Sequence, residues 1–449
     1  MSHPLLTAPI GPSLLRLAGP TTGLMVVQIF VAIAETWIVA RLGIESLAGF
    51  VLVVPFMVLM LNTANGGMGG AVAAALARAL GAGRRDDANA LVLHALVLAF
   101  GFAAVFMALG WTVVPTLFVE MGGSGGTLGR ALVFSNLWFA AAVLAWPSAF
   151  LSALLRGAGD SLRPSHIGLM TAATYVALSA GLALGAGAWP GLGIAGLAIA
   201  AIVATALSTL MLWRIVRRGG LGFVPVFAGV RLQRRLFGEI LHVGLLGSVS
   251  TLTASLTATL VTGLVGSFGT AALAGYGIAM RLEFMLAPLA FGIGTGLTTL
   301  VGTAAGAQDW QRAIRVAWTG GLIAFAAIGA IGWTVALLPG TWSRIFASDP
   351  VVIAASVACI TRVAPFYCLF GLGLTLNFAS QGAGHMAAPF SASILRMVVA
   401  TAGGWLLVER LGWGLTGVFD AIATSLVVYG LLIAGALLFR PWGSKIASS

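Results

Sequence analysis

The fold assignment depends on GLMVVQIFVAIAETWIVARLG, residues 23–43, because a single carboxylate, Glu35, interrupts an otherwise apolar stretch of helix length. At about 1.5 Å per helical residue, Glu35 lies roughly 18 Å from one end of the stretch and about 12 Å from the other. Both distances place it inside a hydrocarbon layer of about 30 Å. An ionisable group at that depth costs on the order of 2.5–3.5 kcal/mol, so it normally faces a bundle interior or wet cavity on an ion or substrate route. Glu35 is therefore the first candidate functional residue.

The composition excludes a soluble domain of this length. Of the 449 residues, 59% are hydrophobic and only 8% are charged, and the mean hydropathy is +1.05, whereas soluble domains are about a quarter charged. The formal charge of +11 consists mostly of Arg between apolar segments, which membrane topology explains better than nucleic-acid binding. Cys359 and Cys368 lack the further Cys or His of a zinc site and are expected to be reduced packing residues. We therefore expect a polytopic membrane protein with no cofactor, metal or nucleic-acid partner.

About twelve apolar runs are long enough to span a bilayer, with clusters of Gly, Pro, Arg and Asp between them. They fall near residues 15–42, 46–77, 90–118, 131–155, 165–188, 192–216, 238–266, 271–303, 313–338, 352–379, 390–408 and 415–439. With the N-terminus inside, sixteen Arg and Lys residues lie on the inner side and four on the outer side. The positive-inside rule therefore predicts an integral protein of the plasma membrane, in a bacterium the inner membrane, with both termini cytoplasmic.

The two halves of the chain repeat each other. TWIVARLGIESLAGF (36–50) matches TGLVGSFGTAALAGY (262–276) at an offset of 226, GAGRRDDA (81–88) matches GAQDWQRA (306–313) and RGAGDSLRP (156–164) matches QGAGHMAAP (381–389) at 225, and GLGIAG (191–196) matches GWGLTG (412–417) at 221. Four matches in order imply two six-helix halves of the same orientation, related by an axis along the membrane normal. We predict an all-α fold with twelve transmembrane helices in two six-helix bundles related by pseudo-two-fold symmetry. The arginine-rich segment 214–235 separates an N-terminal lobe, 1–222, from a C-terminal lobe, 223–449.

Four motifs occur at characteristic spacings. They are the first-span acid followed by T-x-x-x-x-x-L-G (Glu35, Thr36, Leu42, Gly43), R-G-A-G-D-S-x-x-P at 156–164, A-x-Y-G-I-x-x-R-x-E at 274–283 and V-G-x-x-x-G-A at 301–307. Together they resemble the multidrug and toxic compound extrusion (MATE) transporters, over essentially the whole chain, and most closely the DNA-damage-inducible, proton-coupled branch. The resemblance implies two six-helix lobes around a central cavity. It also implies efflux of bulky, often cationic amphipathic compounds in exchange for H⁺ or Na⁺.

The chain departs from the family pattern at its acidic positions. The family usually has Asp in the first span, where this chain has Glu35, and some relatives have an acid in the fifth span, where residues 174–178 have none. Sodium-coupled relatives carry a Glu in the seventh span and an Asp in the tenth. Here the seventh span has only small polar residues, and the tenth offers Asn377. We therefore expect H⁺ as the coupling ion and consider Na⁺ a weaker alternative.

Glu35 is the predicted proton-coupling residue. In a low-dielectric cavity it can bind a proton or, when ionised, attract a cation, and because these two events exclude each other they provide a basis for antiport. Gln28, seven residues earlier on the same helical face, could donate a hydrogen bond to Glu35 and is also predicted to line the substrate cavity.

Four further residues are predicted to line the substrate cavity near Glu35. Asn62 and Asn65, three residues apart in the second span, are expected to share a helical face. Met25 and Trp37 are soft or aromatic side chains suited to adaptable substrate contacts.

The C-terminal half offers secondary candidates. Arg281 and Glu283 are two residues apart and cannot face each other on an ideal helix, so each needs another partner, and Arg396 is the candidate for Glu283. Asp420, in the twelfth span, could pair with Arg396 or act as a second protonatable carboxylate. A structural ion pair and a coupling role both remain open for these residues.

The predicted function is secondary-active export of lipophilic, often cationic compounds by alternating access, by a monomer in the lipid bilayer. One alternative is Na⁺-coupled drug efflux. Another is a lipid-linked oligosaccharide flippase of the same superfamily, which the sequence disfavours because only Arg281, Arg362 and Arg396 lie in or near spans to hold a pyrophosphate. An intramembrane enzyme is disfavoured as well, since His94, His166 and His242 lack a catalytic or metal-binding spacing.

Overall fold

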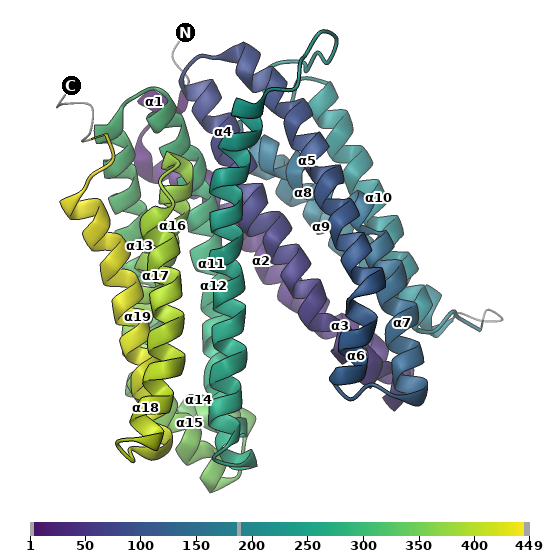
Figure 1. The fold of residues 1–449 in the computed structure, drawn as a ribbon, viewed down its shortest axis with the longest axis vertical. Helices are drawn as coiled ribbons and strands as arrows, with labels where there is room; N and C mark the ends of the chain where they lie inside the picture. The colour runs from purple at the N-terminus through teal and green to yellow at the C-terminus, as the bar shows by residue number, and fades with distance from the viewer. Residues whose placement is uncertain (1–3, 186–189, 444–449) are drawn as a thin grey trace.

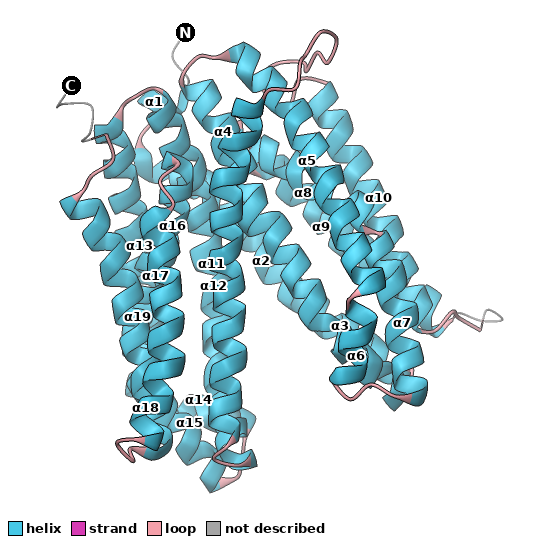
Figure 2. Ribbon diagram, viewed as in Figure 1, coloured by secondary structure: helices cyan, strands magenta, loops and turns pink. Residues whose placement is uncertain are grey.

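The computed structural model describes residues 4–185 and 190–443, and every regular element in these ranges is a helix (Figure 2). Within them, eleven helical stretches are long and apolar enough to cross a membrane, and a bent helix pair makes a twelfth. This confirms the predicted all-α fold of twelve spans. In lipid a helix satisfies its own backbone hydrogen bonds, which is why apolar runs of this length fold as helices.

The spans follow one another as predicted, and three of them are interrupted by a short π or 3₁₀ segment. The first six are α2 (Ile10–Arg41), α3 (Ile44–Asn62) with η1 (Thr63–Met68) and α4 (Gly69–Gly81), α5 (Arg85–Thr112), α7 (Gly125–Ala140) with α8 (Ala142–Gly157), α9 (Leu162–Leu184) and α10 (Ile194–Arg217). The last six are α11 (Arg234–Gly266), α12 (Thr270–Gly306), α13 (Trp310–Leu337), α15 (Pro350–Val363) with η2 (Ala364–Phe366) and α16 (Tyr367–Ala383), α17 (Ala387–Val398) with η3 (Val399–Gly403) and α18 (Gly404–Glu409), and α19 (Gly414–Phe439). The short helices α1 (Pro4–Thr7), α6 (Val114–Glu120) and α14 (Pro339–Phe346) lie outside the spans.

The helices form two bundles in a V (Figure 1). The bundles meet around α1 and α4 and diverge toward α6 and α7 on one side and α14, α15 and α18 on the other. We call these the closed end and the open end. At the closed end all residues of α12 from Gly292 to Ala305 are buried, and α12 packs against α4 and α2. The lobe boundary at residue 222 stays a prediction.

The sequence repeat is also a repeat of backbone conformation. Each of the four matching segments contains a pair of repeat-related residues that both have positive φ. The pairs are Gly43 and Gly269 (97° and 102°), Gly83 and Gln308 (70° and 59°), Gly159 and Gly384 (90° and 79°), and Gly193 and Gly414 (59° and 61°). Gln308 adopts the left-handed conformation despite its Cβ, which indicates that the surrounding fold imposes this turn.

The two halves also contact each other symmetrically at the closed end. Gly81 of α4 lies against the carbonyl of Thr303, and Gly306 of α12 lies against the carbonyl of Arg78, so closely that neither glycine leaves room for a Cβ. Gly81 and Gly306 are 225 residues apart, as are Arg78 and Thr303. The pseudo-two-fold axis therefore passes between α4 and α12.

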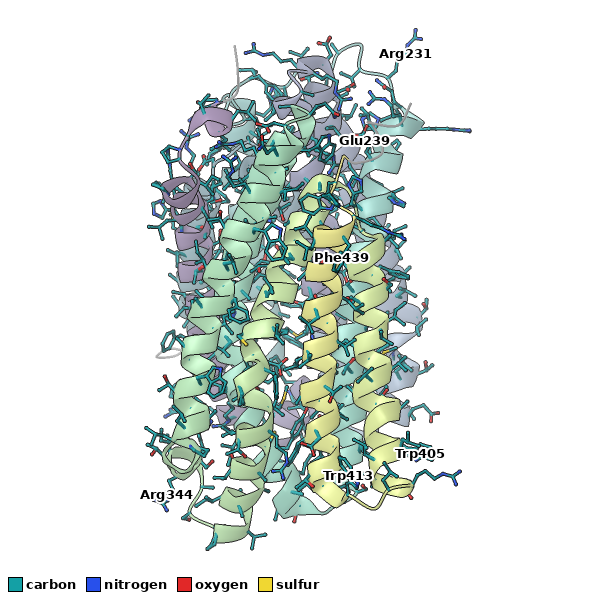
Figure 3. All side chains as sticks on the ribbon, turned by 90° about the vertical axis from the view of Figure 1, so that its left-hand side faces the viewer. Arg231, Glu239, Arg344, Trp405, Trp413 and Phe439 are labelled. Carbon is teal, nitrogen blue, oxygen red and sulfur yellow. The ribbon has the colours of Figure 1, made fainter. Side chains whose placement is uncertain are left out.

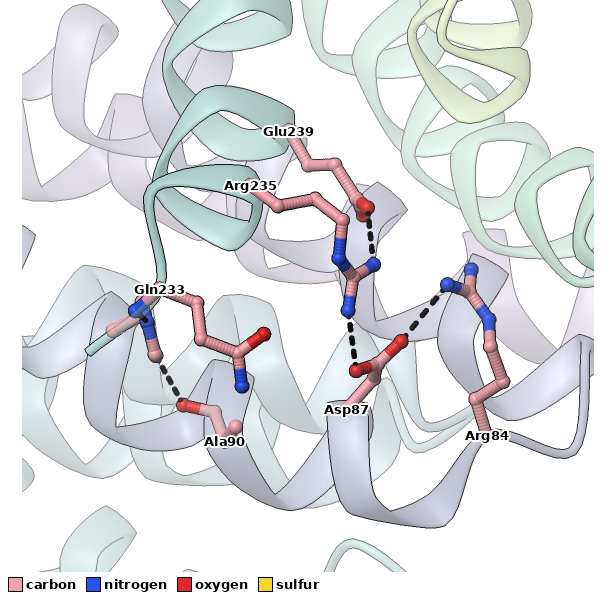
Figure 4. Close-up of polar contacts among 7 residues, drawn as sticks. Arg84, Asp87, Ala90, Gln233, Arg235 and Glu239 are labelled. Carbon is pink, nitrogen blue, oxygen red and sulfur yellow. Dashed lines mark hydrogen bonds and ion pairs between the residues drawn. The ribbon is translucent and has the colours of Figure 1, made fainter. Parts of the chain in front are cut away.

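Polar contacts tie the start of α5 to the start of α11 at the closed end (Figure 4). Asp87 accepts hydrogen bonds from Arg84 at 2.8 Å and from Arg235 at 2.6 Å, and Arg235 also donates to Glu239 at 3.0 Å. His94 accepts a hydrogen bond from the Gln233 backbone N–H at 2.7 Å. These contacts fix the chain where it passes from one half to the other.

The fourth span is bent by 47° between α7 and α8. Pro147 lies inside α8, in its second turn. A proline inside a helix removes one backbone donor and its ring crowds the preceding turn, which accounts for a bend in this part of the span.

Candidate functional site

Glu35 forms a hydrogen bond with a tyrosine of another span. Its Oε1 accepts from the hydroxyl of Tyr175, which comes from α9. Helices α2 and α9 pack against each other, and Gly168 of α9 leaves the space that Leu24 of α2 fills. The small residue brings the two helices close enough for the carboxylate and the phenol to meet.

The Glu35–Tyr175 pair has the chemistry of a proton-exchanging site. A carboxylate that accepts from a phenol is stabilised in its ionised form, and protonation requires this hydrogen bond to weaken or reverse. In the described part of the chain, no group of three or more His, Cys, Asp or Glu side chains could hold a metal ion. A carboxyl group can hold a proton or carry a negative charge, and the Tyr175 hydroxyl can form a hydrogen bond with either form.

The predicted hydrogen bond from Gln28 to Glu35 is wrong. Gln28 lies on the same helix two turns earlier, roughly 10 Å along the axis, and its side chain is exposed. Sharing a helical face did not bring the two groups within reach. The sequence does not predict Tyr175, because an uncharged phenol in an apolar span carries no signal of a buried charge.

The other four predicted cavity residues differ in exposure: two are half-buried and two are exposed. Met25 is half-buried, while Trp37 is exposed and lies under the guanidinium of Arg41, 4.3 Å from the ring centre. Asn62 is exposed at the end of α3. Asn65 is half-buried in η1, where it donates to the Leu61 carbonyl at 3.0 Å. Because η1 is a π-helix, a three-residue spacing no longer guarantees a shared face; a role in substrate contact stays a prediction for all four.

Glu283 and Arg396 form the predicted ion pair inside the C-terminal bundle. Their side chains are 3.5 Å apart and are 16% and 15% exposed, respectively. The Arg396 guanidinium also lies 5.1 Å from the ring centre of Phe370 and 5.5 Å from that of Tyr429. Asn377 donates to the Tyr429 hydroxyl at 3.2 Å. The carboxylate of Glu283 is thus neutralised within a packed cluster.

Asp420 pairs with Arg362 at 3.3 Å, so the predicted pairing with Arg396 is wrong. Arg396 is already held by Glu283, and Arg362 on α15 is the cation that faces α19. Arg281 lies over the ring of Phe346 at 4.7 Å, which confirms that Arg281 and Glu283 have separate partners.

A set of side chain to backbone hydrogen bonds closes the contact between the two halves. Gln381 donates to the carbonyls of Gly66 at 3.3 Å and Gly67 at 2.9 Å, both in η1. Arg78 donates to the Gln381 and Gly382 carbonyls at 3.4 and 3.0 Å.

Arg156, which corresponds to Gln381 in the repeat, also accepts a hydrogen bond from the other half of the chain through its backbone carbonyl. Thr299 donates to the Arg156 carbonyl at 2.9 Å, and Arg156 precedes Gln381 by the repeat offset of 225 residues. The sequence repeat relates the two segments that contain Arg156 and Gln381 but does not predict these contacts.

The MatE family model matches residues 20–180 and 248–406, which is most of the chain. This chain belongs to the MatE family. It is 29% identical to a probable multidrug resistance protein NorM of Deinococcus radiodurans, over 97% of this chain and 96% of the relative. It is 25% identical to a protein of the same description from Thermotoga maritima, over 97% and 94%.

A solved structure described as the outward-facing conformation of a multidrug resistance MATE family transporter of the MOP superfamily has the same fold. The TM-score is 0.89 at 22% identity, covering 100% of this chain and 99% of the other. The family match, the relatives described as probable multidrug resistance proteins and the membrane-spanning helices together make this MatE protein an integral membrane transporter and not an enzyme, as its motifs implied. Its place in the DNA-damage-inducible branch stays a prediction.

Proposed function

We propose that this MatE protein is a proton-coupled multidrug antiporter that exports lipophilic, often cationic compounds across a bacterial inner membrane. It acts as a monomer without a resident cofactor. The observation that carries the proposal is the hydrogen bond between Glu35 and Tyr175 within the apolar first and fifth spans. The relatives named as probable multidrug resistance proteins support the substrate class.

The coupling follows from competition at one carboxylate. Ionised Glu35 is stabilised by Tyr175 and attracts a cationic substrate, whereas protonated Glu35 carries no charge and releases it. Protons from outside therefore displace the substrate outward, and loss of the proton inside restores the charge. A ligand shifts a conformational equilibrium only through its different affinities for the two states. The proton and the substrate therefore each drive one of the two conformational changes of the transport cycle.

The arrangement of the bundles supports alternating access. The closed end is joined by the Gln381, Arg78 and Thr299 contacts, and the bundles diverge at the other end (Figure 1). Most cationic side chains between spans lie at the closed end, and by the positive-inside rule we assign this end and both termini to the cytoplasm. In this assignment the structure corresponds to an outward-open state.

The proposal is tested with purified protein in proteoliposomes, by measuring the efflux of a cationic dye under separately imposed H⁺ and Na⁺ gradients. We expect wild-type efflux to follow the H⁺ gradient and Glu35→Gln to lose it while remaining folded. Glu283→Gln is the matched control, because it removes a carboxylate that already has a cationic partner. The proposal is wrong if Glu35→Gln retains the wild-type rate, or if a Na⁺ gradient alone drives wild-type efflux.

A further inference from the structure

A charged pocket lies on the C-terminal bundle, far from the Glu35 site. It has a volume of about 490 Å³ and lies between α15, η2 and α19. Its charged groups are Arg362 and Asp420, 3.3 Å apart with both side chains 38% exposed. Helix α19 lies on the side of its bundle that faces away from the N-terminal bundle (Figures 1 and 3). In a membrane this side meets lipid.

The Arg362–Asp420 pair is distinct from the interior ion pair of Glu283 and Arg396. On α19, Phe419, Ile422 and Tyr429 are buried in the bundle core, whereas Thr424 is exposed and lines the pocket with Asp420. The pocket therefore opens on the outer surface of the lobe.

The depth of this pair makes its exposure costly. Trp405 and Trp413 lie at the open end of the lobe (Figure 3) and are half exposed, as is typical of a membrane interface. Asp420 follows Trp413 by seven residues, roughly 10 Å along the helix. Exposed charges below the interface are unfavourable unless polar groups or water cover them. A partner that offers both charges would remove this cost.

The chemistry of the pocket specifies such a partner. Arg362 can donate to a phosphate, and Asp420 beside it can accept from an ammonium group. The Thr424 hydroxyl donates to the Asp420 carbonyl at 2.8 Å, which leaves its lone pairs available to the same ammonium. Phe366 and Val427 supply an apolar wall for acyl chains.

We propose that this pocket binds the headgroup of a zwitterionic phospholipid with a primary ammonium, of the phosphatidylethanolamine class. The phosphate lies on Arg362 and the ammonium on Asp420. Phosphatidylcholine fits less well because its quaternary ammonium has no N–H to donate. Phosphatidylglycerol fits less well because it has no cation for Asp420. The site is independent of the proton coupling proposed for Glu35.

The test is native mass spectrometry of the full-length protein released from vesicles that contain equal amounts of the three lipids. We expect several-fold enrichment of phosphatidylethanolamine on the wild type. Asp420→Asn should lose the preference over phosphatidylglycerol, and Arg362→Gln should weaken retention of all three lipids. Asp160→Asn, which disrupts an ion pair of 3.4 Å with Arg163 in a loop outside the pocket, should retain the wild-type pattern.

Equal retention of the three lipids by the wild type, or unchanged enrichment in Asp420→Asn, would overturn the proposal. A cationic dye that binds the lipid-depleted protein through Asp420, and that phosphatidylethanolamine does not displace, would assign the pocket to a lipophilic cation instead. If the variants do not fold, stepwise N-methylation of the lipid tests the wild type alone. Retention should fall as each N–H is replaced by methyl, and constant retention would contradict the assignment.

Discussion

The Tyr175 hydroxyl donates to Glu35, so Tyr175→Phe isolates its part in proton coupling. A hydrogen bond to a charged group contributes about 1.5–3 kcal/mol, and it favours the ionised carboxylate. Without it Glu35 holds its proton more readily, and we expect the half-maximal point of proton-driven efflux to move to higher pH by about one to two units. Initial rates of dye efflux at a series of pH values measure this shift. Tyr276→Phe, in the C-terminal bundle, is the control. An unchanged pH dependence of efflux in Tyr175→Phe would show that the Tyr175 hydroxyl takes no part in proton coupling.

Glu283 should affect stability where Glu35 affects transport. Breaking a buried ion pair costs about 3–5 kcal/mol, and the partial exposure of Glu283 and Arg396 reduces this to about 2–4 kcal/mol. We expect Glu283→Gln to lower the midpoint of thermal unfolding while proton-driven efflux persists. A second substitution, Arg396→Gln, should recover part of the loss because it removes the uncompensated cation. Loss of proton-driven efflux at unchanged stability would instead make Glu283 a coupling residue.

The sequence predicted carboxylates better than their partners. Glu35 is predictable because a lone charge in an apolar helix is costly wherever the helix packs. Tyr175 is not predictable, because it is 140 positions away and the burial of a phenol in an apolar span costs little. Asp420 had two cations within neighbouring spans, Arg362 and Arg396, and only the packing of α15 against α19 decides between them.

At the scale of elements, the crossing of α4 and α12 depends on glycine. Gly306 lies against the Arg78 carbonyl, where a Cβ would collide with backbone. We expect Gly306→Ala to separate the two helices and to destabilise the protein by about 1–3 kcal/mol, the usual cost of overpacking. Thermal unfolding measures the loss. Gly277→Ala is the matched control in the same helix, since beyond the adjacent helix backbone no atom lies within 4 Å of its added Cβ. An equal loss of stability in both variants would contradict the prediction.

Hydropathy predicted the spans but not their interruptions. A run of apolar residues fixes that a helix crosses the membrane, because its backbone must be satisfied internally. In the π-segment η1 the Gly66 and Gly67 carbonyls accept hydrogen bonds from the Gln381 side chain, which comes from the other half of the chain. Such an interruption depends on a contact over more than 300 positions, which local sequence does not contain.

At the scale of the whole molecule, the halves are alike in fold and different in chemistry. The position that corresponds to Glu35 in the repeat is Val261, which is 2% exposed in the core of the C-terminal bundle. The carboxylate of Glu283 in that bundle is neutralised by Arg396. This asymmetry supports a single coupling carboxylate, so the C-terminal bundle would act as the partner against which the N-terminal bundle moves.

Movement between the bundles requires the contacts at the closed end to break. Gln381→Ala removes two hydrogen bonds to η1, which must break when the closed end opens. At about 1–2 kcal/mol in total, their loss should raise the population open at that end roughly five- to thirty-fold relative to the closed population. Electron paramagnetic resonance distances between spin labels at exposed Arg85 and Arg315, one on each bundle, measure this population. Gln233→Ala, a glutamine with an exposed side chain at the same end, should leave the distances unchanged. Identical distance distributions in Gln381→Ala and the wild type would show that the closed end is held by packing alone.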